Sequence, residues 1–294
     1  MKVIYCLILS FVISSVEIIT AQNPGDKGIV LESLVVKSKI LGHDIKYSVY
    51  LPSDYNTSNR SYPVLYLLHG YTDDETSWIQ FGEVNASADK LIANRECAPM
   101  IIVMPDAGLS WYINNYNGSV NYEEAFFSEF LPEIEKAYRI RKSKEFRAIG
   151  GNSMGGYGSM LYSLKHPDMF IACLPFSAAF RNDSLMVKRL RIGESNSNQC
   201  YGKLEGETLP ETWNKNNVLK LAAVLPVSQL NSVKYYLDCG DKDELLFGNS
   251  LLNSILNNRK VPHEFRVRGG EHGWIYWRQS IDDGMKFLNP LFQR

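Results

Sequence analysis

The chain lacks an excess of charge of either sign, because 31 basic side chains stand against 32 acidic ones among its 294 residues. A protein that attracts a nucleic acid through its overall field needs a basic excess, so we expect no nucleic-acid partner. Glycine and proline are also few, at 21 and 12 residues, which excludes collagen-like and disordered chains. The composition therefore predicts a globular protein whose ligand is small or neutral.

Metal-binding and redox motifs are missing as well. No CxxC pair and no HExxH motif occurs, and residues 241–244 do not form a calcium-loop pattern, so we expect no metal and no cofactor. Four cysteines follow residue 21, and three of them lie in or beside apolar runs, which favours buried thiols. Cys200 is expected in a loop, where it could take part in one disulfide. The four are Cys97, Cys173, Cys200 and Cys239.

Long apolar runs are confined to the N-terminus. Lys2 gives a positive start, residues 3–16 are almost continuously apolar or small, and Ala21 offers a small residue before a polar stretch. This is the layout of a secretory signal peptide. An apolar run of about 14 residues is shorter than the ~20 needed to span a bilayer. We predict a signal peptide over 1–21, and a secreted or periplasmic mature protein with no stable membrane insertion.

Short β-rich runs alternate with helical segments along the rest of the chain. Several of the runs are continuously apolar, which is typical of parallel strands covered on both faces. The alternation predicts an open α/β sheet with right-handed crossovers. Pro132 is expected to kink or split the helix in which it lies. The predicted strands are 47–51, 64–68, 100–104, 147–149, 171–176, 234–237 and 264–267. The predicted helices are 86–94, 122–137, 155–164, 246–257 and 279–287.

Residues 181–232 interrupt this alternation. They are rich in Asn, Ser, Lys and Glu and lie between two predicted strands. Segments of this length inside a compact domain usually carry structure of their own or a function. We expect a partly helical excursion over the active site, within a single domain spanning 22–294.

The most specific chemical signal is the G-x-S-x-G pattern of residues 151–155, centred on Ser153. It follows a predicted strand and opens a predicted helix, which is the context that a nucleophile elbow requires. Such a sharp turn strains the serine backbone and needs small neighbours that let the flanking elements approach. The pattern predicts Ser153 as a nucleophile exposed above the sheet.

A serine nucleophile needs a base, and the base needs an acid that follows the serine in the chain. His272 lies in a glycine-flanked loop after the last predicted strand, whereas His166 and His263 fit structural positions, so we predict His272 as the base. Asp243 and Asp241 both lie past the carboxyl end of a predicted strand, where open α/β sheets build their sites. We favour Asp243 and keep Asp241 as the alternative.

The oxyanion of an acyl-transfer intermediate needs two donors. The backbone N–H of Met154, directly after the nucleophile, is one candidate. The loop after the predicted strand 64–68 supplies the other, the N–H of Tyr71. His69 precedes the nucleophile in the chain, so we expect it to pack and hydrogen-bond beneath that loop instead.

Four segments together resemble the putative-esterase (esterase D-like) family of α/β-hydrolases. They are Tyr66-Leu-Leu-His-Gly-Tyr71, Gly151-Asn-Ser-Met-Gly-Gly-Tyr-Gly158, Asp238-Cys-Gly-Asp-Lys-Asp243 and Gly270-Glu-His-Gly-Trp274. The likeness runs from about Ile29 to Phe292 and covers feruloyl, acetylxylan and tributyrin-type esterases, S-formylglutathione hydrolases and mycolyltransferases.

The resemblance implies an α/β-hydrolase fold, with a mostly parallel central sheet and helices on both faces. It also implies hydrolysis of a carboxylic ester through an acyl-enzyme. Carried over residue by residue, it assigns Ser153, Asp243 and His272 to the triad, and Tyr71 with Met154 to the oxyanion donors.

Aromatic residues close to the expected cleft suggest the substrate. Trp78, Trp111, Tyr112 and Trp274 lie in or near loops at the carboxyl end of the sheet, where they could stack on a sugar or on a hydroxycinnamate ring. Together with a signal peptide, these aromatic residues favour feruloyl or acetyl esters of plant polysaccharide as the substrate. The ester could be a small molecule or remain linked to the polysaccharide. A general short-chain esterase or an acyltransferase would share the same triad, and a non-catalytic binding protein is a third reading.

Overall fold

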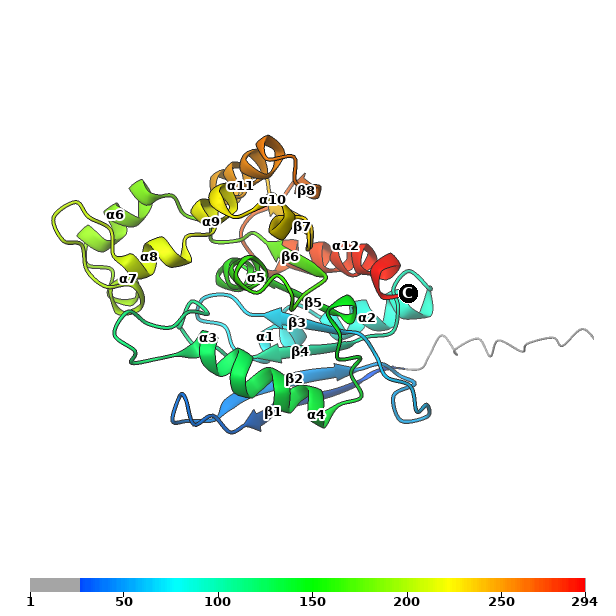
Figure 1. Ribbon diagram of the computed structural model, residues 1–294. Helices are drawn as coiled ribbons and strands as arrows, with labels where there is room; N and C mark the ends of the chain where they lie inside the picture. The colour runs from blue at the N-terminus through cyan, green and yellow to red at the C-terminus, as the bar shows by residue number, and fades with distance from the viewer. Residues whose placement is uncertain (1–26, 294) are drawn as a thin grey trace, which may run out of the picture.

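The computed structural model describes residues 27–293, which form an eight-stranded sheet with helices on both faces (Figure 1). The strand order is β1-β2-β4-β3-β5-β6-β7-β8. The pairs β1–β2 and β2–β4 are antiparallel, and the others are parallel. The strands are β1 (Ile29–Val36), β2 (Ile45–Leu51), β3 (Val64–Leu68), β4 (Ile101–Pro105), β5 (Arg147–Asn152), β6 (Ala172–Phe176), β7 (Lys234–Gly240) and β8 (His263–Arg268). The predicted signal peptide lies outside the described residues.

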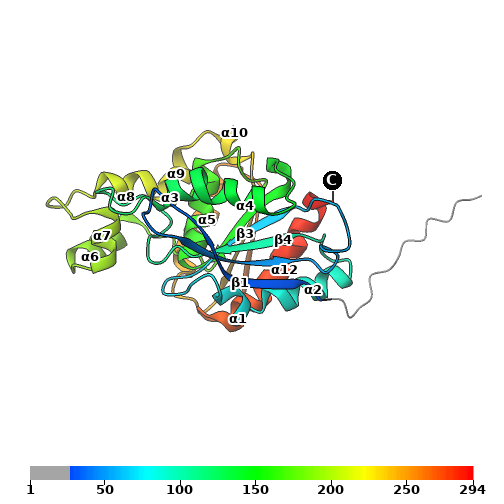
Figure 2. The same cartoon turned by 90° about the horizontal axis from the view of Figure 1, so that it is seen from below.

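The helices divide the apolar core between the two faces of the sheet. Figure 2 shows α1, α2 and α12 below the sheet and α3, α4, α5 and α9 above it. The helical elements are α1 (Ser77–Gln80), α2 (Val84–Ala93), α3 (Tyr122–Ala125), η1 (Phe126–Phe130), α4 (Leu131–Ala137), η2 (Lys144–Phe146), α5 (Met154–Lys165), α6 (Asp183–Arg191), α7 (Ser195–Tyr201), α8 (Glu211–Asn216), α9 (Val218–Val224), α10 (Val227–Leu230), α11 (Leu246–Asn258) and α12 (Trp274–Phe292).

The predicted mostly parallel α/β sheet is confirmed, and burial explains why its strands were readable. Every residue of β3, β4, β5 and β6 is buried, because helices cover both faces of a parallel sheet. β1 was not predicted. It is an edge strand with a mixed pattern of exposed and half-buried residues, and Glu32 and Ser33 interrupt its apolar residues.

The predicted helix 122–137 forms as three joined pieces, α3, η1 and α4. Pro132 lies in the first turn of α4 and cannot donate a backbone hydrogen bond to residue 128. The turn before it widens into a π-helical turn, in which the N–H of Leu131 reaches the carbonyl of Phe126 five residues back. Phe126, Phe130 and Ile134 are buried on one face as predicted, whereas Ala137 is exposed.

Residues 181–232 form the helices α6 to α10, and α6, α7 and α8 project to one side of the sheet (Figure 1). Cys200 lies in α7 rather than in the predicted loop. All four cysteines that the structure describes are buried free thiols, because each is packed as a small apolar side chain. Within residues 27–293, every helix is too short or too polar to cross a membrane.

Candidate active site

Ser153 occupies the sharp turn between β5 and α5. Its φ of +53° is a backbone conformation that residues with a side chain rarely adopt, and surrounding contacts must hold it there. The glycines on either side are required by close approach. A Cβ atom on Gly151 would lie 2.6 Å from the carbonyl oxygen of Leu68, and one on Gly155 would overlap the same carbonyl group. The turn therefore forces the Ser153 side chain out over the carboxyl edge of the sheet.

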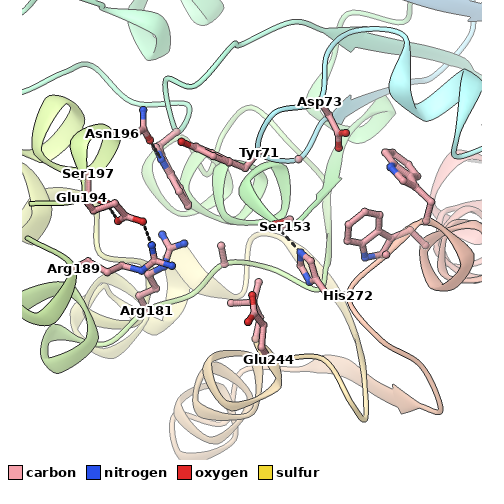
Figure 3. A pocket seen from close by; sticks show the side chains of 17 residues that line it. Tyr71, Asp73, Ser153, Arg181, Arg189, Glu194, Asn196, Ser197, Glu244 and His272 are labelled. Atoms are coloured by element: carbon pink, nitrogen blue, oxygen red, sulfur yellow. Dashed lines mark hydrogen bonds and ion pairs between the residues drawn. The ribbon is translucent and has the colours of Figure 1, made fainter. Parts of the chain in front are cut away.

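Ser153, His272 and Asp243 form a hydrogen-bonded chain at this edge, and Figure 3 shows its first bond, between Ser153 and His272. The hydroxyl of Ser153 lies 3.0 Å from Nε2 of His272, and Nδ1 of His272 lies 2.8 Å from Oδ2 of Asp243. Nδ1 donates to the carboxylate, which leaves Nε2 free to accept the serine proton. Three segments separated by up to 119 residues in sequence meet here.

The environment of Asp243 keeps it ionised. Burial raises its pKa, but the hydrogen bonds from His272 and from the backbone N–H of Leu245 outweigh burial and hold the pKa below its usual range. The Leu245 N–H donates to Oδ1 at 2.8 Å, so that oxygen is fixed while Oδ2 faces the imidazole. Asp241 has another role: its Oδ1 accepts the backbone N–H of Gly270 at 2.9 Å and braces the loop that carries His272.

A buried carboxylate, that of Asp238, links the two elements that flank the His272 loop. Asp238 is fully buried in β7 and accepts hydrogen bonds from Ser280 at 3.2 Å and from Tyr276, both on α12. Arg268, at the end of β8, forms an ion pair with it. The ring of Tyr276 also packs so closely on Gly270 that a Cβ atom there would overlap it. The last strand and the last helix therefore hold both ends of the His272 loop.

His69 lies beneath the loop that follows β3, as predicted. It is buried, its Nδ1 donates to the carbonyl of Gly70 at 2.7 Å, and its Nε2 accepts the backbone N–H of Ala107 at 2.8 Å. This pins the segment in which Tyr71 follows Gly70 at the cavity wall. Met154 begins α5, so its N–H is one of the first-turn donors without an acceptor inside the helix.

His166 and His263 lie away from the triad, in structural positions. His166 ends α5, hydrogen-bonds to Glu123 at 3.0 Å and stacks on Phe127 at 3.9 Å between ring centroids. His263 begins β8 and contacts Asn253 of α11 at 2.8 Å.

A cavity of about 480 Å³ opens over Ser153 (Figure 3). This size is in the range of small-molecule sites. One wall comes from the loops after β3 and before α12, and the opposite wall comes from residues that follow β6 and from α6 and α7. The lining residues are Gly70, Tyr71, Asp73, Trp111, Ser153, Ala179, Arg181, Arg189, Glu194, Asn196, Ser197, Glu244, Leu245, His272, Gly273, Trp274 and Trp277.

Two of the four aromatic residues predicted to bind substrate are core residues instead. Trp78 is fully buried and donates its indole N–H to the carbonyl of Leu68 at 2.9 Å. Tyr112 is also fully buried and donates its hydroxyl to the carbonyl of His69 at 2.9 Å. Both rings support the site from beneath and contact no substrate space. Trp111 and Trp274 do line the cavity.

The polar residues of the excursion were missed by sequence reasoning, although the excursion itself was predicted. Arg181, Arg189, Glu194, Asn196 and Ser197 all line the cavity. One signal was available for Arg181, which lies five residues beyond the carboxyl end of β6, where such sheets place their functional groups. The others reach the cavity only through the packing of α6 and α7.

The family match and the most similar known proteins that we compared all point to esterases. The description "Putative esterase" applies to a family that matches residues 38–288. The chain belongs to the putative esterase family. An esterase of Mycobacterium tuberculosis is 30% identical over 280 residues, which cover 86% of this chain and 58% of that protein. An endo-1,4-beta-xylanase/feruloyl esterase of Xylanibacter ruminicola is 37% identical over 259 residues, which cover 84% of this chain and 29% of that protein.

A solved ferulic acid esterase aligns with a TM-score of 0.78 and 33% identity, and the alignment covers 90% of this chain and 99% of that one. The α/β-hydrolase fold that the family resemblance implied is thereby confirmed. The chain spans little more than half the length of the first of these curated relatives and under a third of the second.

Proposed function

We propose that this protein is a secreted serine carboxylesterase, acting through an acyl-enzyme on feruloyl or acetyl esters of plant polysaccharide. The observation that carries the proposal is the chain of hydrogen bonds from Ser153 through His272 to Asp243, at 3.0 and 2.8 Å, at the base of a cavity sized for a small ligand. Ester hydrolysis fits this arrangement because no group besides the protein's own is needed to activate the nucleophile.

The reaction begins when the Ser153 hydroxyl attacks the acyl carbonyl carbon and its proton passes to Nε2 of His272. The imidazolium that forms lies against the Asp243 carboxylate, which stabilises its positive charge. The backbone N–H groups of Tyr71 and Met154 donate to the oxyanion of the tetrahedral intermediate. His272 then gives its proton to the departing alcohol oxygen. The same imidazole takes a proton from a water molecule, which attacks the acyl-enzyme, and returns that proton to the Ser153 oxygen as the bond to the acyl group breaks and the acid leaves.

The proposed substrate rests on the cavity and on the relatives. Trp111 and Trp274 present aromatic rings to the cavity, and such rings stack on sugars and on phenolic acids. Two relatives that carry a feruloyl or ferulic acid esterase name are 37% and 33% identical to this chain. The predicted signal peptide would deliver the enzyme to polysaccharide outside the cytoplasm.

The test compares wild-type protein with Ser153→Ala on 4-nitrophenyl acetate, 4-nitrophenyl butyrate, methyl ferulate and acetylated xylan. We expect the substitution to lower kcat by about 10⁴-fold or more on every hydrolysed ester. Unchanged hydrolysis by the variant would overturn the mechanism. Activity confined to the 4-nitrophenyl esters would overturn the proposed substrate class, and transfer to an added alcohol in preference to water would make the protein an acyltransferase. N-terminal sequencing of protein recovered outside the expressing cells should begin at Gln22.

A further inference from the structure

Arg181 is a buried cation in the wall of the active-site cavity. The residue as a whole is only 9% exposed, and among residues 27–293 no carboxylate lies within ion-pair distance of its side chain. Its Nε is buried without any hydrogen-bond partner in that range. A buried guanidinium normally has its donors satisfied, because an unpaired buried charge is costly. An unsatisfied one in the wall of the cavity that contains the nucleophile therefore points to a partner that arrives with the substrate.

The neighbouring acid is already engaged. Glu194 forms an ion pair with Arg189 and accepts a hydrogen bond from Ser197, so its charge is balanced without Arg181. Arg181 instead lies over the ring of Trp111, with its guanidinium carbon 4.3 Å from the ring centroid. The indole N–H of Trp111 is in turn held by Asn196 at 2.5 Å. Stacking on the indole orients the guanidinium and uses none of its N–H donors.

The backbone that carries Arg181 is tied directly to the nucleophile. The N–H of Ala179 donates to the carbonyl of Ser153 at 3.0 Å. The side-chain amide of Asn249, on α11, donates to the carbonyl of Ala178 at 2.9 Å, and the N–H of Ser177 donates to the backbone carbonyl of Asp238 at 2.7 Å. A group held by Arg181 would therefore keep a fixed position relative to the reacting hydroxyl.

The other charged groups of the cavity do not cancel this cation. In Figure 3, Asp73 lies on the opposite side of Ser153 from Arg181, and Glu244 extends from a third side. Burial, and then the neighbouring Arg189, lower the pKa of Arg181 to about 10, which still leaves it charged at neutral pH. The end of the cavity formed by α6 and α7 is therefore electropositive.

We propose that Arg181 is a substrate-binding residue that receives a carboxylate carried by the ester substrate. This deepens the proposed function and rests on it, because the carboxylate belongs to the same molecule that Ser153 attacks. A carboxylate fits better than a phosphate monoester: it matches the planar fork of one guanidinium and carries the single charge that one unpaired arginine can balance. The carboxylate can belong to the acyl group, as in a dicarboxylic monoester, or to the alcohol, as in a uronic acid.

Matched pairs of substrates distinguish these two sources. The acyl pair is 4-nitrophenyl hemisuccinate and 4-nitrophenyl butyrate, and the alcohol pair is 4-acetoxybenzoate and 4-acetoxybenzamide. For each pair the ratio of kcat/KM, anionic over neutral and corrected for spontaneous hydrolysis, is measured in wild type, Arg181→Met and Arg181→Lys. The ratio cancels any effect of the substitution on the triad. Arg191→Met is the matched control, because Arg191 is an exposed arginine on α6 outside the cavity.

We expect Arg181→Met to lower the ratio about 10-fold to 100-fold in one pair, the range of a charged hydrogen bond. Arg181→Lys should give an intermediate ratio, and Arg191→Met the wild-type ratio. Equal ratios in wild type and Arg181→Met for both pairs would overturn the proposal while leaving the esterase function intact.

Failure of the esterase function itself has a different signature, which is no Ser153-dependent hydrolysis of either neutral ester. In that case the role of Arg181 is tested by measuring ligand binding, which needs no turnover. Calorimetry with 4-nitrophenyl hemisuccinate and 4-acetoxybenzoate compares Ser153→Ala with Ser153→Ala/Arg181→Met. A Kd at least about 10-fold weaker in the double variant supports the carboxylate site, and equal Kd values overturn it. Arg181→Lys in the same background provides a second variant if the methionine protein does not fold.

Discussion

Replacing Asp243 by Asn tests the triad at its most informative point, because the change removes a charge and keeps the shape. The Oδ1 atom can still accept the Leu245 N–H, which holds it at 2.8 Å, so we expect the fold to persist. The new amide group would face Nδ1 of His272, now 2.8 Å from a carboxylate oxygen. The imidazole would then carry its proton on Nε2 and could no longer accept one from Ser153.

The size of the effect follows from the same distance. A full positive charge on the imidazole and the Asp243 carboxylate attract each other by about 6 kcal/mol at 2.8 Å, with an effective dielectric constant of about 20 for a partly buried pair. The asparagine dipole retains part of this, so about 4–5 kcal/mol of transition-state stabilisation is lost. At 1.36 kcal/mol for each factor of ten, kcat should fall about 10³-fold to 10⁴-fold.

The assay is steady-state hydrolysis of 4-nitrophenyl acetate at pH 7 to 8, with circular dichroism to verify folding. Asp241→Asn is the matched control, since it removes the same charge two residues away while its oxygen can still hold Gly270. We expect that variant to stay within about 10-fold of wild type. A folded Asp243→Asn protein with activity inside the same range, or a larger loss in Asp241→Asn, would refute the assignment of Asp243.

Three further outcomes are expected. His263→Ala should retain activity towards the same ester, and an inactive but folded variant would contradict the choice of His272. Trp78→Phe should lower the free energy of unfolding by about 1–3 kcal/mol in urea, because the carbonyl of Leu68 loses its donor, with no change in selectivity among acyl groups. Burial raises the pKa of Glu123, but His166 and Lys165 outweigh it and hold the pKa below its usual value. The stabilisation is thus present above the unfolded-state pKa and lost as pH falls through the folded one, so Glu123→Gln should destabilise the protein by about 1–3 kcal/mol at pH 7 and by much less at pH 3. An equal loss at both pH values would contradict that linkage.

The sequence predicted the parts of the site that depend on short-range chemistry. The elbow around Ser153 was recognisable because the turn needs glycines at fixed offsets, and the loops of Asp243 and His272 because each follows a predicted strand after Ser153 in the chain. The bounds of those strands were less accurate: β5 and β7 extend to Asn152 and Gly240, where glycine and polar residues hide the end of the apolar run.

The direction in which a loop side chain points was what could least be predicted from the sequence. Trp111 and Tyr112 are adjacent, and both have a positive φ, +55° and +58°; the turn sends the indole to the cavity and the phenol into the core. Nothing in residue type separates the two. The same reasoning explains the missed Arg181, whose place in the wall depends on the packing of the segment after β6 against α11.

The anchoring of the His272 loop by α12 has a consequence for the growing chain. Ser153 and its elbow lie in the first half of the described residues, and Asp243 follows in β7's outgoing loop. Asp241 braces the start of the His272 loop, and its far end is held by α12, whose Tyr276 and Ser280 donate to the buried carboxylate of Asp238. We therefore expect a nascent or truncated chain that lacks α12 to hold an assembled nucleophile without a working base. Synthesis of the last helix would then be the step that switches the chemistry on.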